Sequence, residues 1–267
     1  SSNSASAAKG GGISNDLGTL TLTDSTFSGN SANNGGGISH NEGAVMVTNS
    51  TFSGNSATNE GPGIFTDSPS GTLSVTRSTF FGTSASADNG GGGIIMVGTL
   101  NLSVTLFSAR TSGKNCVNLG TLNVNGYNLS NDATCTNGGT GSATNAPLNL
   151  GALADNGGLT LTHLPGAGSA AIGALPNGTT ISNNGTSWTC TDGETVTHQR
   201  GEPPPLTRGD AGTPAAVEVS YPAPGAADDN APDVEDAPAT TIDVPANDTD
   251  IDGGPKSIDS VTQPANG

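Results

Sequence analysis

The chain has 267 residues, of which 41 are glycine, while only 3% are aromatic and 11% are charged. Globular proteins have about a quarter of their residues charged, and so few aromatic side chains cannot form a thick aromatic core. The net charge of −16 is uneven, because residues 1–150 carry seven acidic and four basic side chains whereas residues 228–259 carry ten acids and one lysine. A basic surface for nucleic acid is therefore absent. No stretch approaches the ~20 apolar residues that span a bilayer, so we expect neither a nucleic-acid partner nor membrane insertion within this chain.

Three short phrases recur in a fixed order along the first half of the chain, as in repeat proteins. The first is a glycine run that ends at isoleucine, in residues 10–13, 35–38, 61–64 and 91–94. The second alternates apolar and polar residues, in residues 19–23, 44–48, 72–76, 99–103 and 121–125. The third is Ser-Thr-Phe, ending at Phe27, Phe52 and Phe80, with Leu106 and Leu129 expected at the same place in later repeats. These five positions are 25, 28, 26 and 23 residues apart.

The spacings predict an all-β fold, a right-handed parallel β-helix with three-strand coils of about 22–30 residues in residues 1–145. The period of two in the second phrase places one apolar set on a single face. This set is Leu20, Leu22, Val45, Val47, Leu73, Val75, Leu100, Leu102, Leu122 and Val124. Stacking the coils at ~4.8 Å would bury this face and give each strand two hydrogen-bonded neighbours.

Asparagine recurs in the phrase Ser-Gly-Asn-Ser-Ala, at Asn30 and Asn55. We expect these side chains to stack in successive turns and to bond to the backbone and to each other. Residues 2–5 match residues 29–32. The chain is therefore expected to begin inside a coil, either with earlier coils before it or with a partner covering this open end.

The next segment carries a family resemblance. Leu-Gly-Ala-Leu-Ala-Asp-Asn-Gly-Gly at residues 150–158, Thr-Leu-Thr-His-Leu-Pro-Gly at 160–166 and Gln-Arg-Gly at 199–201 resemble the closing region of bacterial choice-of-anchor β-helix surface proteins. These proteins are similar to polymorphic outer-membrane and pectate-lyase-like β-helices. The resemblance covers residues 1–222 and implies a β-helix at the bacterial cell surface, with an irregular capping segment at 146–222.

Two further regions follow. Residues 223–236 are typical of an acidic Pro/Ala linker. Residues 237–267 resemble the first strands of cadherin-like or Ig-like repeats and form a partial β-sandwich-like tail. A sandwich needs about 100 residues, so either this is part of a longer protein or the tail completes a neighbouring subunit by β-augmentation.

Calcium is the one cofactor candidate. Oxygen ligands at alternate positions, followed by glycine, are what a calcium loop requires. The ligands would be Asp248, Asp250, Asp252 and Asp259. The alternative interpretation is an acidic turn between strands without metal.

The cysteines suggest a crosslink. Cys116 and Cys135 are 19 residues apart, close to one coil, which would place them on adjacent turns. A disulfide there would fit an oxidising extracellular setting. Cys190 would then be unpaired.

Two columns of turn residues are the only enzyme-like constellations in the repeats. They are Asp24, Asn49 and Arg77, and Asp16, Asn41 and Asp67. A polysaccharide lyase would need clustered acids beside a base, but Asp24 and Arg77 would lie ~10 Å apart across two coil spacings. The simpler interpretation is solvated turn residues and an asparagine/aspartate ladder. We find no carboxylate pair of the kind that glycoside hydrolysis requires.

Threonines at the start of the second phrase form a surface column. Its members are Thr19, Thr72, Thr99 and Thr121, with Ala44 in the second coil. Flat threonine arrays occur on ice-binding β-helices, so ice binding is one alternative function. The next outward column, which contains Met46, is irregular.

We therefore expect a secreted or surface-displayed structural or adhesive module of a large bacterial surface protein, and not an enzyme. Its partners would be host or cell-surface glycans or proteins. A sharper variant is self-association, head to tail, into fibres through the open coil and the C-terminal strand. A polysaccharide lyase is the first alternative and an ice-binding protein the second.

Overall fold

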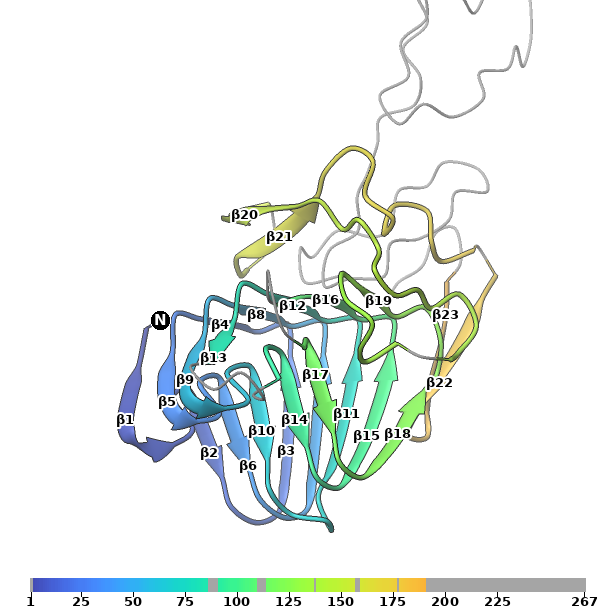
Figure 1. Ribbon diagram of the computed structural model, residues 1–267. Helices are drawn as coiled ribbons and strands as arrows, with labels where there is room; N and C mark the ends of the chain where they lie inside the picture. Colours follow the sequence, from blue (N-terminus) through green and yellow to red (C-terminus); the bar gives the residue numbers. More distant parts are fainter. Residues whose placement is uncertain are drawn as a thin grey trace, which may run out of the picture. The chain divides into compact units, whose positions relative to one another are not determined.

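A computed structural model describes residues 2–85, 91–109, 114–136, 138–156, 159–176 and 178–190. All of them belong to the first of the two units into which the chain divides, Ser1–Val219. The linker and tail predicted for residues 223–267, with the proposed calcium ligands, lie outside the described residues. The described part contains strands and no helix. Its centre is a parallel β-solenoid, as the repeats predict (Figure 1).

Four parallel sheets run along the solenoid, and each strand bonds to its equivalent in the coils before and after. The leucine sheet consists of β3 (Thr19–Thr23), β7 (Ala44–Thr48), β11 (Thr72–Thr76), β15 (Thr99–Ser103) and β18 (Thr121–Val124). The phenylalanine sheet consists of β4 (Thr26–Ser28), β8 (Thr51–Ser53), β12 (Thr79–Phe81), β16 (Leu106–Ser108) and β19 (Leu129–Ser130). The isoleucine sheet consists of β2 (Ile13–Asn15), β6 (Ile38–His40), β10 (Ile64–Thr66), β14 (Ile94–Met96) and β17 (Cys116–Asn118).

The fourth sheet, here the Ser-Ala sheet, is an element that the sequence analysis did not predict. It consists of β1 (Ser4–Lys9), β5 (Ser31–Asn34), β9 (Ser56–Glu60) and β13 (Ser84–Ala85). A ladder of asparagines holds the turn before it. Asn55 Oδ1 accepts from the Asn30 backbone N–H at 3.0 Å and from Asn30 Nδ2 at 2.9 Å, and Asn30 Oδ1 accepts likewise from Asn3. The predicted ladder is confirmed, and by aligning the turns it brings the following Ser-Ala pairs into strand register.

The leucine sheet supplies one side of the core. Val45, Val47, Leu73, Val75, Leu100 and Leu102 have no exposed surface. Residues in register are separated by one coil, as with Leu20 beside Val45 and Leu73 beside Leu100. The alternation in the sequence therefore predicts the inward face correctly.

The phenylalanine sheet supplies the other side through a stack of rings. Phe27, Phe52, Phe80 and Phe107 follow one another with centroids 5.0, 4.7 and 5.1 Å apart and planes within 13° of parallel. The expected place of Leu106 in this column is wrong by one residue, since Phe107 pairs with Phe80. The reason is that Thr105-Leu106-Phe107 replaces Ser-Thr-Phe in this coil. Thr105 Oγ1 donates to the Ser103 carbonyl at 2.9 Å, just as Ser78 Oγ donates to that of Thr76.

Glycine runs make room for the stacked rings. A Cβ on Gly37 would lie 3.0 Å from Cδ1 of Phe52, and one on Gly63 would lie 3.0 Å from Cδ1 of Phe80. Each Cβ would come closer still to the carbonyl oxygen of the glycine in the next coil, at 2.5 Å for Gly37 and 2.2 Å for Gly63. Glycine is therefore needed here both for the close approach of successive coils and for the packing of the rings.

The last coil is covered by the chain that follows it. Asp132 accepts hydrogen bonds from the backbone N–H of Asn115 at 2.6 Å and of Thr134 at 2.8 Å. Burial alone would raise the pKa of Asp132, but these bonds, with those from the Ser130 and Thr134 hydroxyls, outweigh it and lower the pKa. Beside it, the Ser130 N–H donates to Ala143 at 3.0 Å. Cys116 of β17 likewise donates its N–H to Thr134 Oγ1 at 3.1 Å, so residues of the last coil bond to the chain that follows it.

A hairpin of β20 (Leu150–Ala154) and β21 (Thr162–Pro165) lies against the outer face of the phenylalanine sheet (Figure 1). His163 anchors it, with 1% of its surface exposed. Its Nδ1 lies 2.7 Å from the Gly151 carbonyl oxygen, which can only accept, so Nδ1 carries the proton and Nε2 accepts from Ser53 Oγ at 2.9 Å. The ring also lies 4.1 Å from that of Phe81. Burial lowers the pKa of His163, against the opposing effect of the bond to Gly151.

Shortening one stacked ring should destabilise the solenoid strongly. We expect Phe52→Ala to lower the free energy of unfolding by about 3–5 kcal/mol, because it leaves a cavity in a filled column. Chemical denaturation measures this loss. Leu17→Ala is the control, since Leu17 is 68% exposed and its truncation should cost less than about 0.5 kcal/mol. A loss below about 1 kcal/mol for Phe52→Ala would show that the stack is dispensable.

The His163 anchor should make stability depend on pH. Its pKa in the folded chain lies below the ordinary value of about 6.5, so the unfolded chain binds this proton more readily. The contribution of His163 is present in full above about pH 6.5 and is lost as the pH falls towards the folded pKa. Denaturation midpoints between pH 8 and pH 5 should fall for the wild type, and fall less for His163→Gln. Equal slopes for the two proteins would contradict this assignment.

Candidate binding groove

The turn that leaves the leucine sheet is strained in every coil. Its residue has a positive φ in all five coils although none of the five is glycine: Asp24 (48°), Asn49 (50°), Arg77 (46°), Val104 (53°) and Tyr127 (55°). Asparagine and aspartate tolerate this left-handed conformation, but for other residues it costs of order 1–2 kcal/mol. Interactions made by other residues must therefore stabilise the left-handed conformation.

A hydroxyl ladder provides that support. The residue after each strained one bonds back across the turn, as Ser25, Ser50 and Ser78 do when they donate to the carbonyl two residues earlier at 2.8, 2.8 and 2.9 Å. The hydroxyls of Ser50 and Ser78 also accept from the coil before them. The Ser25 N–H donates to Ser50 Oγ at 3.3 Å, and the Ser50 N–H donates to Ser78 Oγ at 3.2 Å. The ladder fixes the backbone and leaves the strained residue's side chain to vary.

The strained residues of the later coils lie under a second hairpin, β22 (Thr180–Asn183) and β23 (Thr186–Thr189). Val104 and Tyr127 form an apolar cluster with Leu175, Ile181 and Cys190, against which Trp188 also packs. The Arg77 guanidinium lies over the Trp188 ring, 4.7 Å from its centroid. The prediction that Arg77 is a solvated turn residue is wrong, since the hairpin covers it and leaves 6% of it exposed.

Asn183 fastens this hairpin to the outer face of the leucine sheet. Its Nδ2 donates to the Val75 carbonyl at 3.0 Å and to Thr76 Oγ1 at 2.8 Å. Its Oδ1 accepts from Asn125 Nδ2 at 3.0 Å. One carboxamide thereby bridges two coils that are more than 50 residues away in the sequence.

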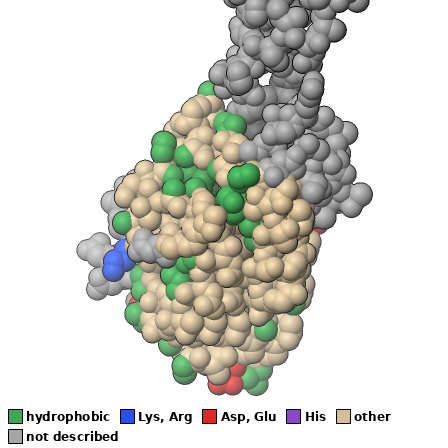
Figure 2. All heavy atoms as spheres, turned by 90° about the vertical axis from the view of Figure 1, so that its right-hand side faces the viewer, with side chains coloured by type: hydrophobic (Ala, Val, Ile, Leu, Met, Phe, Trp, Pro, Cys, Tyr) green, Lys and Arg blue, Asp and Glu red, His purple; other side chains and the backbone are tan. Residues whose placement is uncertain are grey.

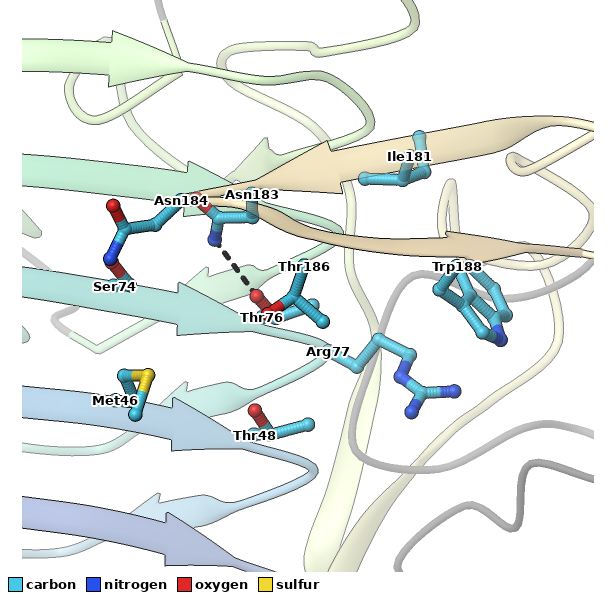
Figure 3. Close-up of a pocket in the computed structure, with 10 residues that line it drawn as sticks. All are labelled: Met46, Thr48, Ser74, Thr76, Arg77, Ile181, Asn183, Asn184, Thr186 and Trp188. Atoms are coloured by element: carbon cyan, nitrogen blue, oxygen red, sulfur yellow. Dashed lines mark hydrogen bonds between the residues drawn. The ribbon is translucent and has the colours of Figure 1, made fainter.

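A groove opens between the hairpin and the sheet (Figure 3). Its floor comes from β7 and β11 and its wall from the hairpin. The lining residues are Met46, Thr48, Ser74, Thr76, Arg77, Ile181, Asn183, Asn184, Thr186 and Trp188. On the floor, Ser74 Oγ accepts from Asn101 Nδ2 at 3.2 Å, and Asn101 in turn accepts from Asn123 at 2.8 Å.

The chemistry of the groove suits binding better than catalysis. None of the described residues that line it is Asp, Glu, His or Cys, so it offers no general acid, general base or thiol nucleophile. It offers hydroxyl and amide groups beside the apolar surfaces of Met46, Ile181 and Trp188. Sequence reasoning missed this site. Two signals pointed to it: the only tryptophan in the chain, and an arginine where the earlier coils have Asp24 and Asn49.

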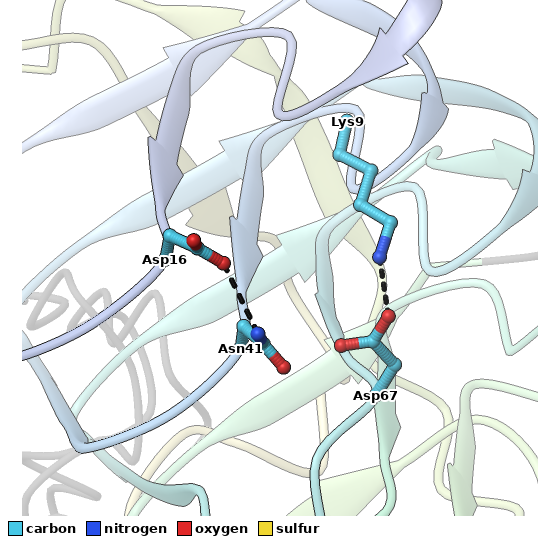
Figure 4. A network of polar contacts seen from close by, with 4 residues as sticks. All are labelled: Lys9, Asp16, Asn41 and Asp67. Carbon is cyan, nitrogen blue, oxygen red and sulfur yellow. Dashed lines mark hydrogen bonds and ion pairs between the residues drawn. The ribbon is translucent and has the colours of Figure 1, made fainter.

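The members of the second predicted column follow residues that are in register in successive coils, as expected, but their side chains make different contacts (Figure 4). Asn41 Nδ2 donates to Asp16 Oδ1 at 3.1 Å, whereas Asp67 forms an ion pair with Lys9. Lys9 reaches Asp67 from the Ser-Ala sheet and also lies 5.7 Å from the centroid of the Phe65 ring. Within the described ranges no three His, Cys, Asp or Glu side chains are grouped so as to hold a metal ion.

The threonine column has the expected register. Thr19 and Thr72 flank Ala44, and Thr72, Thr99 and Thr121 follow one another on the outer face of the leucine sheet. Thr19 and Thr121 are exposed, whereas Thr72 and Thr99 are half-buried. The column is therefore neither uniform nor equally accessible.

The three cysteines are buried and free in the structure. Cys116 and Cys135 belong to the same apolar cluster, and the disulfide between them stays a prediction. Burial and the nearby Asp132 carboxylate raise the pKa of the Cys116 thiol far above its usual range. A thiol in that state is a poor nucleophile.

Comparisons with known proteins add no relative. No protein-family model matches the chain, and no curated protein or solved structure matches it either. The fold thus defines the class, a parallel β-solenoid. Among the described residues no helix is long and apolar enough to cross a membrane.

Removing the Asn183 carboxamide should loosen the hairpin. We expect Asn183→Ala to cost about 1–3 kcal/mol, because it removes the three hydrogen bonds that the buried Asn183 carboxamide makes to the solenoid. Amide hydrogen exchange across residues 180–189 should speed up while exchange in β7 and β11 stays slow. Ser182→Ala, on the exposed face of the same strand, is the matched control. If both variants exchange alike, Asn183 is not the fastening residue.

Proposed function

We propose that this chain is an extracellular structural and adhesive module of a bacterial surface protein. The observation that carries the proposal is the unbroken register of the coils. Three sheets have five strands each in parallel register, and the phenylalanine stack and the two polar ladders follow the same axis. Neighbouring coils are joined through three or four strand pairings each, which makes a stiff scaffold.

The surface chemistry supports adhesion through weak polar contacts. Figure 2 shows a face made mostly of uncharged polar side chains and backbone, with few charged groups. Such a face lacks the strong single-sign field that steers charged partners. Partners would be glycans or proteins at a cell surface, bound by hydroxyl and amide groups repeated from coil to coil.

The alternatives find less support. A polysaccharide lyase needs acids clustered beside a base, but Asp67 is paired with Lys9, and Arg77 is covered by Trp188. Ice binding would use a flat threonine array, which Ala44 and Met46 interrupt. Head-to-tail fibres would use a strand from residues 237–267, which lie outside the described residues. In the described part, the backbone N–H groups of Cys116 in β17 and Ser130 in β19 already donate to residues that follow the last coil.

Surface display is the first test. An antibody against the solenoid should label intact cells of the source organism, and external protease should remove the label. Labelling only after permeabilisation would contradict the proposal.

The enzyme alternative has its own assay. The purified chain should release no unsaturated product from polygalacturonate or alginate, measured by ultraviolet absorbance with and without calcium. Steady product formation that scales with protein concentration would favour the lyase instead.

A further inference from the structure

We propose that the groove between the leucine sheet and the β22–β23 hairpin is the ligand site of this module, and that it binds a neutral saccharide. This inference deepens the adhesive role and rests on it. Like most small-molecule sites, the groove is concave and sets a few polar groups among apolar side chains.

Hydrogen-bonding groups face the groove from both sides. Thr48 lies on the floor, and Thr186 and Asn184 lie on the wall (Figure 3). Their side chains make no hydrogen bond to any other described residue, so they can donate to and accept from a ligand. Thr76 Oγ1 accepts from Asn183, which leaves its own proton to donate. A ligand rich in hydroxyl groups matches this arrangement.

Apolar surface lies between these polar groups. Met46 is half-buried on the floor, and Ile181 and Trp188 form the wall beside it. Trp188 Nε1 is shielded from solvent and has no hydrogen-bond partner within the described residues. A sugar ring matches both kinds of surface, because it has an apolar C–H face and a rim of hydroxyl groups. A purely apolar ligand would leave the threonine hydroxyls without hydrogen bonds, which costs binding free energy.

The groove favours a neutral ligand over an acidic one. Arg77 is its only charged lining residue among those described, and this side chain is 6% exposed and stacked on Trp188. Carboxylates are bound best by guanidinium groups that present their N–H donors to the ligand. Arg77 here packs on Trp188 as part of the groove wall and does not present its N–H donors to a ligand.

A peptide strand fits less well. Strand addition uses the free N–H and C=O groups of a sheet edge. The floor of the groove is instead the face of a sheet whose interior strands β7 and β11 are paired on both sides. Binding there must use side chains, as saccharide recognition does.

The single tryptophan makes the site directly observable. Since Trp188 is the only tryptophan of the 267 residues, intrinsic fluorescence of the full chain reports the groove alone. The probes are cellohexaose, xylohexaose and mannohexaose as neutral oligosaccharides, with hexagalacturonate as the acidic comparison. At least one neutral probe should give a saturable change, with hexagalacturonate at least tenfold weaker.

Paired variants test the residues. Thr48→Val with Thr186→Val removes one hydroxyl from each side and should weaken binding about tenfold or more, because each lost hydrogen bond to a ligand is worth roughly fivefold. Thr19→Val with Thr121→Val makes the same change on exposed parts of the same sheet outside the groove and should leave affinity within about twofold. Valine suits strands, so both variants should fold, which circular dichroism checks.

Three outcomes would overturn the inference: no saturable change with any neutral probe, equal binding of the acidic probe, or equal loss in both variant pairs. These results are separable from the surface-labelling test. A displayed protein that binds no sugar refutes only the groove, and a sugar-binding protein confined inside the cell refutes only the adhesive role.

Discussion

The structure depends on the contact between a column of phenylalanine rings and a column of glycines. The rings of Phe27, Phe52, Phe80 and Phe107 stack about one strand spacing apart. A Cβ at Gly37 or Gly63 would crowd both these rings and the backbone of the next coil. Although only 3% of its residues are aromatic, the chain places four of its six phenylalanines in this one stack. Offset stacks of this kind add about 0.5–1.5 kcal/mol per pair beyond burial.

This contact also sets the register of everything outside it. Once the rings are stacked, equivalent turns lie one above another, and the asparagine and hydroxyl ladders connect them. The turns after the leucine sheet then present a column of side chains at one corner. The β22–β23 hairpin covers these side chains in the later coils, where they are Arg77, Val104 and Tyr127. The groove lies at the edge of this hairpin.

Much of the solenoid could be predicted from the sequence because its contacts repeat. The alternation in residues 19–23 and its copies identifies the buried face, and Asn30 and Asn55 identify the ladder. The exchange of Ser-Thr-Phe for Thr105-Leu106-Phe107 misled the prediction by one residue, because the hydroxyl that defines the turn, and not the leucine, marks the register. The Ser-Ala strands were missed because two small residues carry no apolar signal.

The groove could not be predicted in the same way. Asn183 meets Thr76 across 107 residues, and no repeat links the two segments. Nothing in the composition of residues 180–189 indicates which face of the solenoid they cover. The arginine at a position otherwise held by Asp24 and Asn49 marks where the surroundings of the turn change, but its partner Trp188 becomes apparent only in three dimensions.

The strained turn has a consequence for how such a surface can diversify. The residue after the left-handed position bonds back across the turn and holds the backbone, through a hydroxyl in four coils and through the Asn128 carboxamide in the fifth. The side chain at the left-handed position can therefore vary, and aspartate, asparagine, arginine, valine and tyrosine all occupy it. The corner is thus a row of positions at a fixed spacing, where the side chain can vary while the backbone stays the same. Mutation at these positions can change which segment packs on the solenoid, or which ligand it binds, without changing the strands of the coils.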